Sequence, residues 1–565
     1  DRAQNLYEQA LTIAETSGQP ELLWNLQFNL GYLLAMEQNP YAAIFFGKQA
    51  VNTIQGMREG IVEIEKDLQS SFLDTQWYVY RFLAGLLIDL GRLPEAQQIL
   101  QMQKEEEYFD FLCRNSGNKD VRTTKAGYTD EELKWAKEYR KMGKRLNSLG
   151  KEFSKLKDKK REGLTDRESK RYRQLADEIE GTRVTFTNQL GQLANNLSSV
   201  SGKQNTAPDK KGSSRPEELQ HALKKLGHGA VLVHYLIIDD RVRIILTTQN
   251  RQLAYTVEIS SAELNRKIMS FRKTLQNPRR PHLEEAQALY EIFISPIDPD
   301  LKKTGAETLL FSLDGTLRYL PVSALYDGES YLVERFQLAI YTAAAGFNFK
   351  DGPTGGWEVG GLGLSRAVRN LEPLPFVPGE LEGIVRRNKS DRDGVLPGVI
   401  YLDEAFSQEA FKSVLKKNYP VVHIASHFEL KPGTKDDSHL VLGDGTALTL
   451  AQIRDDNFDF DDVEILSLSA CNTGVGSLGP DGSEIESFGT LAQDQGAKGV
   501  VATLWPVADH STGVLMQSFY KFHAEQPDLT KAAALRQAQV EFIRGKWISQ
   551  NGAIRTRGMR VSQVE

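Results

Sequence analysis

The feature that most constrains this chain is a regular alternation of short apolar runs and helical patterns over residues 357–545. The predicted strands are residues 360–364, 399–402, 421–426, 464–469 and 499–504, and the predicted helices are residues 379–387, 407–416, 484–495 and 511–524. Parallel strands cannot be joined by tight turns, so such an alternation requires crossover connections. The sequence therefore predicts a mainly parallel sheet covered by helices.

A second strand-rich region lies upstream, over residues 218–350. Its predicted strands are residues 230–238, 242–248, 253–259 and 308–312, and its predicted helices are residues 261–275 and 283–294. The first three strands follow one another closely enough to form a meander. Residues 201–217 are rich in Gly, Ser, Pro and charged residues, a composition typical of a flexible linker.

Residues 1–110 are helical and weakly repetitive. Small and apolar residues occupy positions typical of two tetratricopeptide (TPR) repeats: Leu30, Gly31, Leu34, Ala43 and Ala50, then Leu83, Ala84, Leu87, Gly91, Ala96 and Leu100. The small residues would let two antiparallel helices approach closely. The repeats are spaced more widely than usual, which predicts an extended helix over residues 49–68. A plain helical bundle is the alternative, and either version would bind or orient a partner rather than perform chemistry.

Residues 111–200 predict a hairpin of two long helices that separate near residue 163. Within it, residues 131–173 carry 16 Lys and Arg against 8 Asp and Glu, the most basic stretch of the chain. A nucleic-acid interface is one interpretation, but few aromatic residues interleave with the charges. A solvated helix face is favoured.

Composition excludes several classes of protein. The 565 residues have a net charge of −6 and only two cysteines, Cys113 and Cys471, which excludes a disulfide scaffold and suits a reducing compartment. Cys113 is interpreted as a small core residue. No apolar run is long enough to span a membrane, so we expect a cytoplasmic protein without a membrane partner. The sequence begins inside a helical pattern, so truncation at either end stays open.

The candidate chemistry lies at the ends of two predicted strands. Cys471 follows the strand at 464–469, and His427 follows the strand at 421–426. A thiol and an imidazole delivered by neighbouring strand ends can act as nucleophile and general base. The backbone N–H groups of Cys471 and Phe428 could stabilise an oxyanion. A buried structural thiol is the alternative for Cys471.

The sequence favours no metal and no cofactor. His423 is a rival base, but it lies about 13 Å from His427 along an extended strand, so the two cannot share one metal ion. No second cysteine lies nearby to complete a zinc site. Residues 474–479 match a dinucleotide-binding glycine pattern, yet Pro480 follows where a helix should begin.

Three sequence blocks carry a family resemblance. Residues 423–427 (HIASH), 468–474 (LSACNTG) and 496–509 (GAKGVVATLWPVAD) resemble, in the same order, the signature blocks of the CHAT family. These are caspase-like peptidase domains associated with TPR repeats, and they are similar to separase. Residues 320–325 resemble a further block from the front of such domains. The likeness covers roughly residues 220–545.

The resemblance implies a fold and roles for single residues. It implies a caspase-like α/β/α sandwich, with residues 218–350 as its N-terminal, pseudo-caspase-like part and residues 351–545 as its catalytic part. Residues 546–565 lack the closing segment that such domains often carry, and we expect them to be a disordered or truncated tail. His427 would be the general base and Cys471 the nucleophile. The likeness to separase suggests Asp509 as the acid that binds a basic residue before the cut. A helix N-cap is the alternative for Asp509, and Glu484, Glu486 and Asp494 are weaker candidates for that acid.

The sequence thus predicts a cysteine endopeptidase that cleaves protein substrates. The TPR-like repeats would bind a substrate or a regulatory protein, and the glycine-rich residues 474–482 are the candidate gating loop. The alternative is a catalytically inactive TPR–CHAT scaffold for protein–protein interaction. A nucleic-acid sensor acting through residues 131–173 is a third, less favoured reading.

Overall fold

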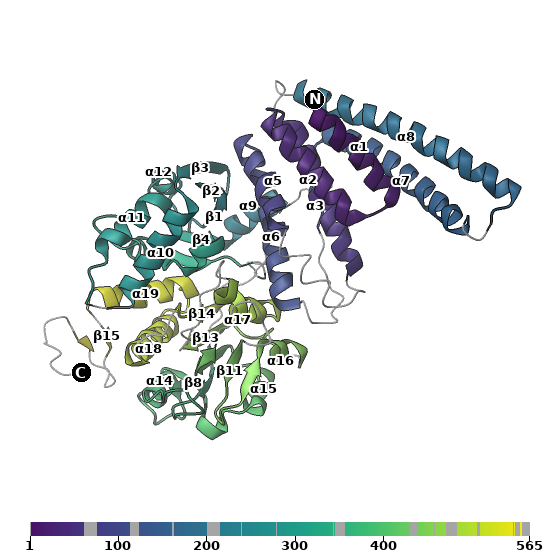
Figure 1. The fold of residues 1–565 in the computed structure, drawn as a ribbon. Coiled ribbons are helices and arrows are strands. Elements are labelled where there is room, and N and C mark those ends of the chain that lie inside the picture. The colour runs from purple at the N-terminus through teal and green to yellow at the C-terminus, as the bar shows by residue number, and fades with distance from the viewer. Residues whose placement is uncertain are drawn as a thin grey trace. The chain divides into compact units, whose positions relative to one another are not determined.

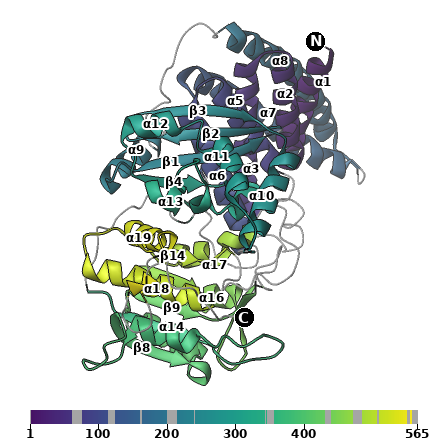
Figure 2. The same ribbon diagram turned by 90° about the vertical axis from the view of Figure 1, so that its left-hand side faces the viewer.

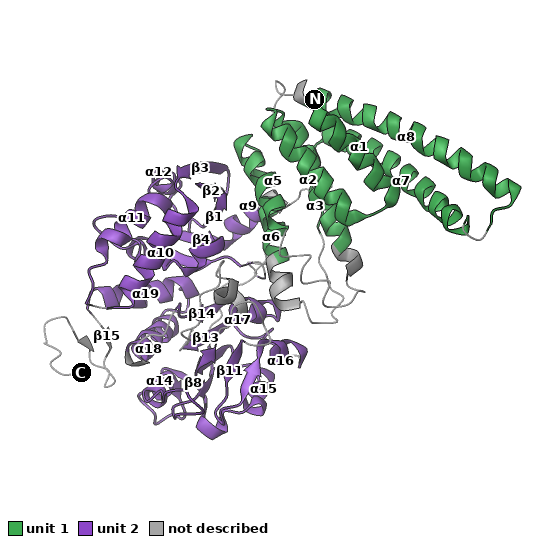
Figure 3. Ribbon diagram, in the orientation of Figure 1, with its two compact units in different colours: residues 1–106, 117–218 green, residues 107–116, 219–565 purple. Residues whose placement is uncertain are grey.

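A computed structural model of the chain divides into two compact units, residues 1–106 with 117–218 and residues 107–116 with 219–565 (Figure 3). The structure describes residues 2–61, 76–113, 124–160, 163–199, 215–238, 240–277, 279–342, 344, 356–429, 438–456, 458–469, 483–504, 509–545, 547–548 and 554–555.

The first unit is entirely helical in its described part. Its helices are α1 (Arg2–Ser17), α2 (Pro20–Met36), α3 (Pro40–Ile61), α5 (Trp77–Asp89), α6 (Leu93–Cys113), α7 (Asp130–Lys159) and α8 (Asp166–Ser199), of which the end of α6, from residue 107, belongs to the second unit. Helix α2 packs along α3, and α1, α7 and α8 pack together beside them (Figure 1). The side chains of α1, α2, α3, α7 and α8 share one hydrophobic core. The predicted helical N-terminal region is confirmed, and its paired helices are compatible with TPR repeats.

Local sequence features explain these helices. Gly31 lies where a Cβ atom would stand 3.1 Å from the carbonyl oxygen of Ala43, so the small residue permits the close approach of α2 and α3 that the sequence predicted. Helix α7 starts with a capping box, in which the Thr129 hydroxyl accepts from the Glu132 amide and the Glu132 carboxylate accepts from the Thr129 amide. Its lysines, Lys134, Lys137, Lys141 and Lys144, are exposed along one solvated face.

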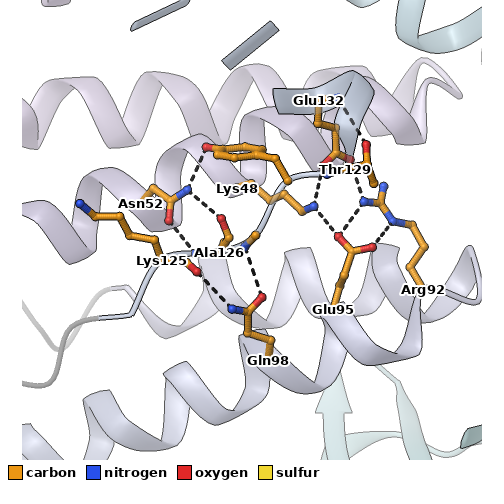
Figure 4. A network of polar contacts seen from close by, with 11 residues as sticks. Lys48, Asn52, Arg92, Glu95, Gln98, Lys125, Ala126, Thr129 and Glu132 are labelled. Carbon is orange, nitrogen blue, oxygen red and sulfur yellow. Dashed lines mark hydrogen bonds and ion pairs between the residues drawn. The ribbon is translucent and has the colours of Figure 1, made fainter. Parts of the chain in front are cut away.

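A network of buried charges joins three helices of this unit (Figure 4). The Lys48 ammonium of α3 is fully buried and contacts both Glu95 of α6 and, at 2.6 Å, Glu132 of α7. Arg92 donates two hydrogen bonds of 2.7 Å to Glu95 and lies 2.8 Å from Glu132. Burial by itself would raise the pKa of Glu132, but Lys48 and Arg92 hold that pKa below its ordinary value. Two cations and two carboxylates therefore neutralise one another inside the unit.

Replacing Lys48→Met should destabilise the first unit by about 3 kcal/mol, because it leaves two buried carboxylates with one cation between them. Urea unfolding, followed by a probe in this unit, measures the change in the free energy of unfolding. The matched control is Lys159→Met, which removes the half-exposed ion pair between Lys159 and Glu168 and should cost less than about 1 kcal/mol. Equal effects of the two substitutions would contradict the structural role of the buried network.

The second unit contains two main sheets, of which the first spans residues 231–340. Its strands are β1 (Val231–Ile238), β2 (Arg241–Thr247), β3 (Gln252–Glu258), β4 (Thr308–Ser312) and β5 (Gln337–Ile340), in the order β3-β2-β1-β4-β5. The strands β1, β2 and β3 form the predicted antiparallel meander, whereas β4 pairs in parallel with β1 and β5. Around it lie α9 (Arg215–Leu226), α10 (Ser261–Leu275), α11 (Leu283–Phe293), α12 (Asp298–Thr304), α13 (Leu332–Arg335) and the 3₁₀ turns η1 (Gly315–Tyr319) and η2 (Val322–Ala324).

The second sheet has six strands, and all of its pairings are parallel. The strands are β6 (Val359–Gly363), β7 (Val385–Arg386), β8 (Leu396–Leu402), β9 (Val421–Ala425), β13 (Ile465–Ser469) and β14 (Val500–Ala502), in the order β14-β13-β9-β6-β8-β7. The ladders pair Ser469 with Ala425 and Gly363 with Ala425, so β13, β9 and β6 end at the same level. This sheet confirms the prediction of a mainly parallel α/β domain.

Helices cover both faces of the parallel sheet. They are α14 (Val377–Ile384), α15 (Gln408–Lys416), α16 (Leu450–Asp455), α17 (Ser483–Asp494), α18 (Asp509–Glu525) and α19 (Lys531–Ile543), with the turn η3 (Asp403–Ala405). One apolar core contains Val359, Val421, Ile465 and residues of α14, α18 and α19. A separate core on the other face contains Val422, Leu466 and residues of α15, α16 and α17. The alternation of residues along each strand thus builds a three-layer α/β/α sandwich.

Helix α19 connects the two sheets of this unit, and Figure 2 shows it between them. Arg536 of α19 donates hydrogen bonds to the carbonyl oxygens of Val333, at 3.0 Å, and Glu334. The Thr530 hydroxyl donates to the Gln337 side chain at 2.9 Å. The two sheets of the unit are therefore held by specific polar contacts.

Some elements were absent from the prediction. The small antiparallel sheet of β10 (Phe428–Glu429), β11 (His439–Val441) and β12 (Ala447–Thr449), and the helices α9, α16 and α19, were not expected. In the tail after residue 545, the described residues form the short antiparallel pair β15 (Trp547–Ile548) and β16 (Ile554–Arg555). Most of the predicted linker lies outside the described residues, and its end is the start of α9 at Arg215.

Among the described helices, none combines the length and the apolarity that crossing a bilayer requires.

Candidate functional site

The candidate site is at the carboxyl-terminal edge of the parallel sheet, next to a reversal in strand order. After β6 the chain runs to β7 and β8 on one side, and afterwards it returns to β9 and β13 on the other. The loops that leave β6 and β9 therefore diverge, and open α/β sheets bind ligands at such switch points. Glu372 lies in the loop after β6, and His427 lies directly after β9.

A hydrogen bond across this switch point fixes the His427 ring. Its Nε2 atom lies 2.9 Å from the backbone carbonyl oxygen of Glu372, and the residue is only 4% exposed. A carbonyl can only accept, so Nε2 must carry the proton. In the neutral ring the lone pair is then on Nδ1, which is the nitrogen able to take a proton from a nucleophile.

The backbone around His427 is held from several directions. The amide of Leu364 donates to the carbonyl of Ala425 at 3.0 Å, and the Ser426 hydroxyl donates to the carbonyl of Val441 at 2.6 Å. The amide of Val441 in turn donates to the carbonyl of His427 at 2.9 Å. Strand β11, which was not predicted, thus holds residues 426–427 in place by hydrogen bonds from and to Val441.

Phe428 follows His427, and its side chain and its backbone amide have different surroundings. Its side chain is 2% exposed and its ring stacks on Phe488 of α17, with ring centroids 5.2 Å apart. The bond from Val441 to His427 makes Phe428 and Leu440 a non-hydrogen-bonded pair, so the Phe428 amide is directed away from β11. That amide is the one that the sequence analysis assigned to an oxyanion site, while the phenyl ring belongs to the core.

The predicted nucleophile, Cys471, lies outside the described residues, as do the glycine-rich residues 474–482. Strand β13 is described as far as Ser469, which pairs with Ala425 of β9. Cys471 and His427 each follow this last pair by two residues in the sequence. The side chain of the other cysteine, Cys113 in α6, also lies outside the described part.

The predicted substrate-binding acids are placed only by their helices. Helix α18 begins at Asp509 rather than near residue 511, so Asp509 lies in its first turn. Glu486 lies in α17. The side chains of both residues lie outside the described part, so neither the pocket role nor the N-cap alternative for Asp509 is tested.

The rival base, His423, is in the interior. It is fully buried on β9, with Nε2 2.9 Å from Glu380 and Nδ1 3.1 Å from the Tyr520 hydroxyl. Both ring nitrogens are occupied by protein partners. Within the described part of the chain, no cluster of three or more His, Cys, Asp or Glu side chains could hold a metal ion.

The hydrogen-bond partners around His427 and His423 were not predicted from the sequence. They are Glu372, Glu380, Tyr520 and, beyond Tyr520, Ser467. Glu372 acts through its carbonyl, which carries no side-chain signal. Glu380 and Tyr520 lie on helices far from β9 in sequence and meet His423 only in three dimensions. The available signal was His423 inside the predicted strand 421–426, because a polar side chain in a buried strand needs hydrogen-bond partners.

Comparison with known proteins identifies one family. The CHAT domain family model matches residues 283–554, from α11 to β16. This span includes β4, β5 and the whole parallel sheet, and starts later than the roughly 220–545 of the sequence resemblance. A search of curated proteins finds no match.

The hydrogen bond to the Glu372 carbonyl predicts which ring nitrogen of His427 carries the proton. We expect the neutral ring to be the Nε2–H tautomer, with Nδ1 unprotonated, since only that form satisfies the carbonyl. Long-range ¹H–¹⁵N correlation spectra of selectively labelled protein, assigned with His427→Gln, measure this directly. A dominant Nδ1–H tautomer would contradict the geometry described here.

Proposed function

The chain is a CHAT-domain protein, and from this premise we propose that it is a cysteine endopeptidase in which Cys471 and His427 form a catalytic dyad. CHAT domains have a caspase-like fold related to cysteine peptidases, and the three-layer sandwich fits that fold. The single observation that supports the proposal most is His427 itself. Its ring is oriented by a carbonyl so that Nδ1 is basic, at the end of the strand beside β13.

The strand register gives the dyad its spacing. Ser469 pairs with Ala425, and two further residues lead to Cys471 and His427 respectively. Paired residues of neighbouring strands are about 5 Å apart, a separation that a thiol and an imidazole can close by side-chain rotation. The proposal thus requires only that Cys471, two residues beyond Ser469, lies within side-chain reach of His427.

The reaction follows from the chemistry of these groups. The Cys471 proton moves from Sγ to Nδ1 of His427, and the thiolate attacks the scissile carbonyl carbon. The Phe428 and Cys471 amides stabilise the oxyanion of the tetrahedral intermediate. The imidazolium keeps its Nε2–H bond to Glu372 and returns its proton to the leaving amine as the C–N bond breaks. Water, deprotonated by Nδ1, then hydrolyses the thioester and restores the thiol.

Substrate preference is assigned to Asp509. A carboxylate at the start of α18 would favour Arg or Lys before the cut through a charge-assisted contact. Glu486 in α17 is the weaker alternative. The paired helices of the first unit, compatible with TPR repeats, would bind the protein substrate or a regulatory protein, and residues 474–482 would gate the site. A reducing, cytoplasmic location suits a catalytic thiol.

The alternative function is an inactive scaffold that only binds proteins, and thiol reactivity separates the two. With an iodoacetamide probe at neutral pH, we expect Cys471 to react at least about tenfold faster than Cys113, because a paired imidazole raises the thiolate fraction. His427→Ala should abolish this difference. Mass spectrometry of the labelled peptides measures both rates, with His221→Ala, a histidine of α9, as the control. Equal, slow labelling of both thiols in the wild type would reject the enzyme.

Asp509→Ala should reduce kcat/KM for peptides with Arg or Lys before the cut by about a hundredfold, since a charge-assisted contact is lost. Digestion of a peptide library by wild type and variant measures the change in preference. Glu486→Ala tests the weaker candidate under the same conditions. An unchanged preference in Asp509→Ala would reject its role in the pocket, and a change confined to Glu486→Ala would transfer that role.

A further inference from the structure

A chain of four polar side chains crosses the interior of the parallel sheet. Glu380 of α14 accepts from Nε2 of His423 at 2.9 Å, and Nδ1 of His423 lies 3.1 Å from the Tyr520 hydroxyl of α18. The same hydroxyl lies 2.6 Å from Oγ of Ser467 on β13. All four residues are at most 3% exposed. The proposed reaction uses none of them.

Most of the strand positions around this layer are apolar. On the same face of β9, the neighbours of His423 are Val421 and Ala425, and on β13 the neighbours of Ser467 are Ile465 and the buried Ser469. Apolar residues would fill this layer at a lower desolvation cost. Buried polar networks restrict a core to one arrangement, because every other arrangement leaves a donor or acceptor unpaired. The network therefore favours one relative placement of the four elements.

These four elements are the ones that carry the proposed site. His423 and Ser467 are register partners in the ladder between β9 and β13, and each lies four residues before a member of the dyad. Tyr520 is on the helix that begins at Asp509, and Glu380 is on the helix that follows the loop of Glu372. One network thus connects the strands that precede His427 and Cys471. It also connects them to the helix that begins at Asp509 and to the helix that follows the Glu372 loop.

We propose that Glu380, His423, Tyr520 and Ser467 are positioning residues that fix the ends of β9 and β13 relative to each other, and thereby His427 relative to Cys471. The inference deepens the proposed peptidase function and rests on it for its catalytic consequence. Its structural part, the orientation of His427, stands independently of any activity.

Tyr520 is the central member, because its hydroxyl alone contacts both strands. Burial raises the pKa of Tyr520, although the bond to Ser467 opposes this, so the hydroxyl stays protonated. With a neutral His423, the Tyr520 hydroxyl donates to Nδ1 and accepts from Ser467, while Nε2–H donates to the Glu380 carboxylate. Every donor in the chain then has an acceptor. Loss of this single hydroxyl leaves both Nδ1 and the Ser467 hydroxyl without their partner.

The test is Tyr520→Phe in the full chain, since it removes one oxygen and keeps the ring that fills the core. The matched control is Tyr235→Phe in the other sheet, where an equally buried hydroxyl donates to the Phe293 carbonyl at 2.8 Å. We expect both variants to fold with similar losses of Tm. Only Tyr520→Phe should slow Cys471 alkylation and lower kcat, by about 10- to 100-fold, with KM little changed, because misplaced reacting groups affect the chemical step.

A second measurement separates this inference from the proposed function. The ¹⁵N and ¹H resonances of the His427 ring should shift or broaden in Tyr520→Phe and stay unchanged in Tyr235→Phe. If the ring responds but the wild type shows no selective thiol reactivity, the positioning role holds and the peptidase function fails. If the His427 resonances of Tyr520→Phe match the wild type, or if both variants slow alkylation equally, the network serves stability alone and the inference is overturned.

Discussion

The parallel ladder between β9 and β13 is the constraint on which the rest of the second unit depends. Because strands of equal direction end at one edge, the last register pair, Ala425 and Ser469, lies at the same edge of the sheet. Parallel pairing also requires crossover helices, which bring α14 and α18 onto one face of the sheet. The position of His427, the carbonyl that orients its ring and the start of α18 all follow from that arrangement.

Polar groups inside this sandwich lie where orientation matters. Most strand positions are apolar and supply the hydrophobic driving force, while His423 and Ser467 interrupt that pattern at one level of the sheet. Such a layer costs desolvation, which the hydrogen bonds among Glu380, His423, Tyr520 and Ser467 offset. The backbone carbonyl of Glu372 provides the same kind of pairing for His427, as an acceptor 2.9 Å from Nε2.

The first unit uses buried charge in a different way. Lys48, Arg92, Glu95 and Glu132 come from α3, from the start of α6 with the turn before it, and from the start of α7. Each of the two cations contacts both carboxylates, so removing one cation leaves buried negative charge without its full compensation. Gly31, in contrast, permits a close contact between α2 and α3 by its small size.

The sequence by itself determined the fold class, because strand and helix periodicities are local and the alternation over residues 357–545 permits little except a parallel sheet. It also suggested His427 as a candidate base, because a histidine that follows a buried strand can be recognised from the sequence alone. It missed β10–β12 and the helices α9, α16 and α19, whose short or mixed patterns become regular only by packing. The tertiary structure alone decided that His423 is an interior residue and that Glu372 orients His427, because Glu380, Tyr520 and a backbone carbonyl reach these rings across 43, 97 and 55 residues of chain. No local pattern records contacts at such separation, and only the crossover geometry of the sheet brings them within hydrogen-bond distance.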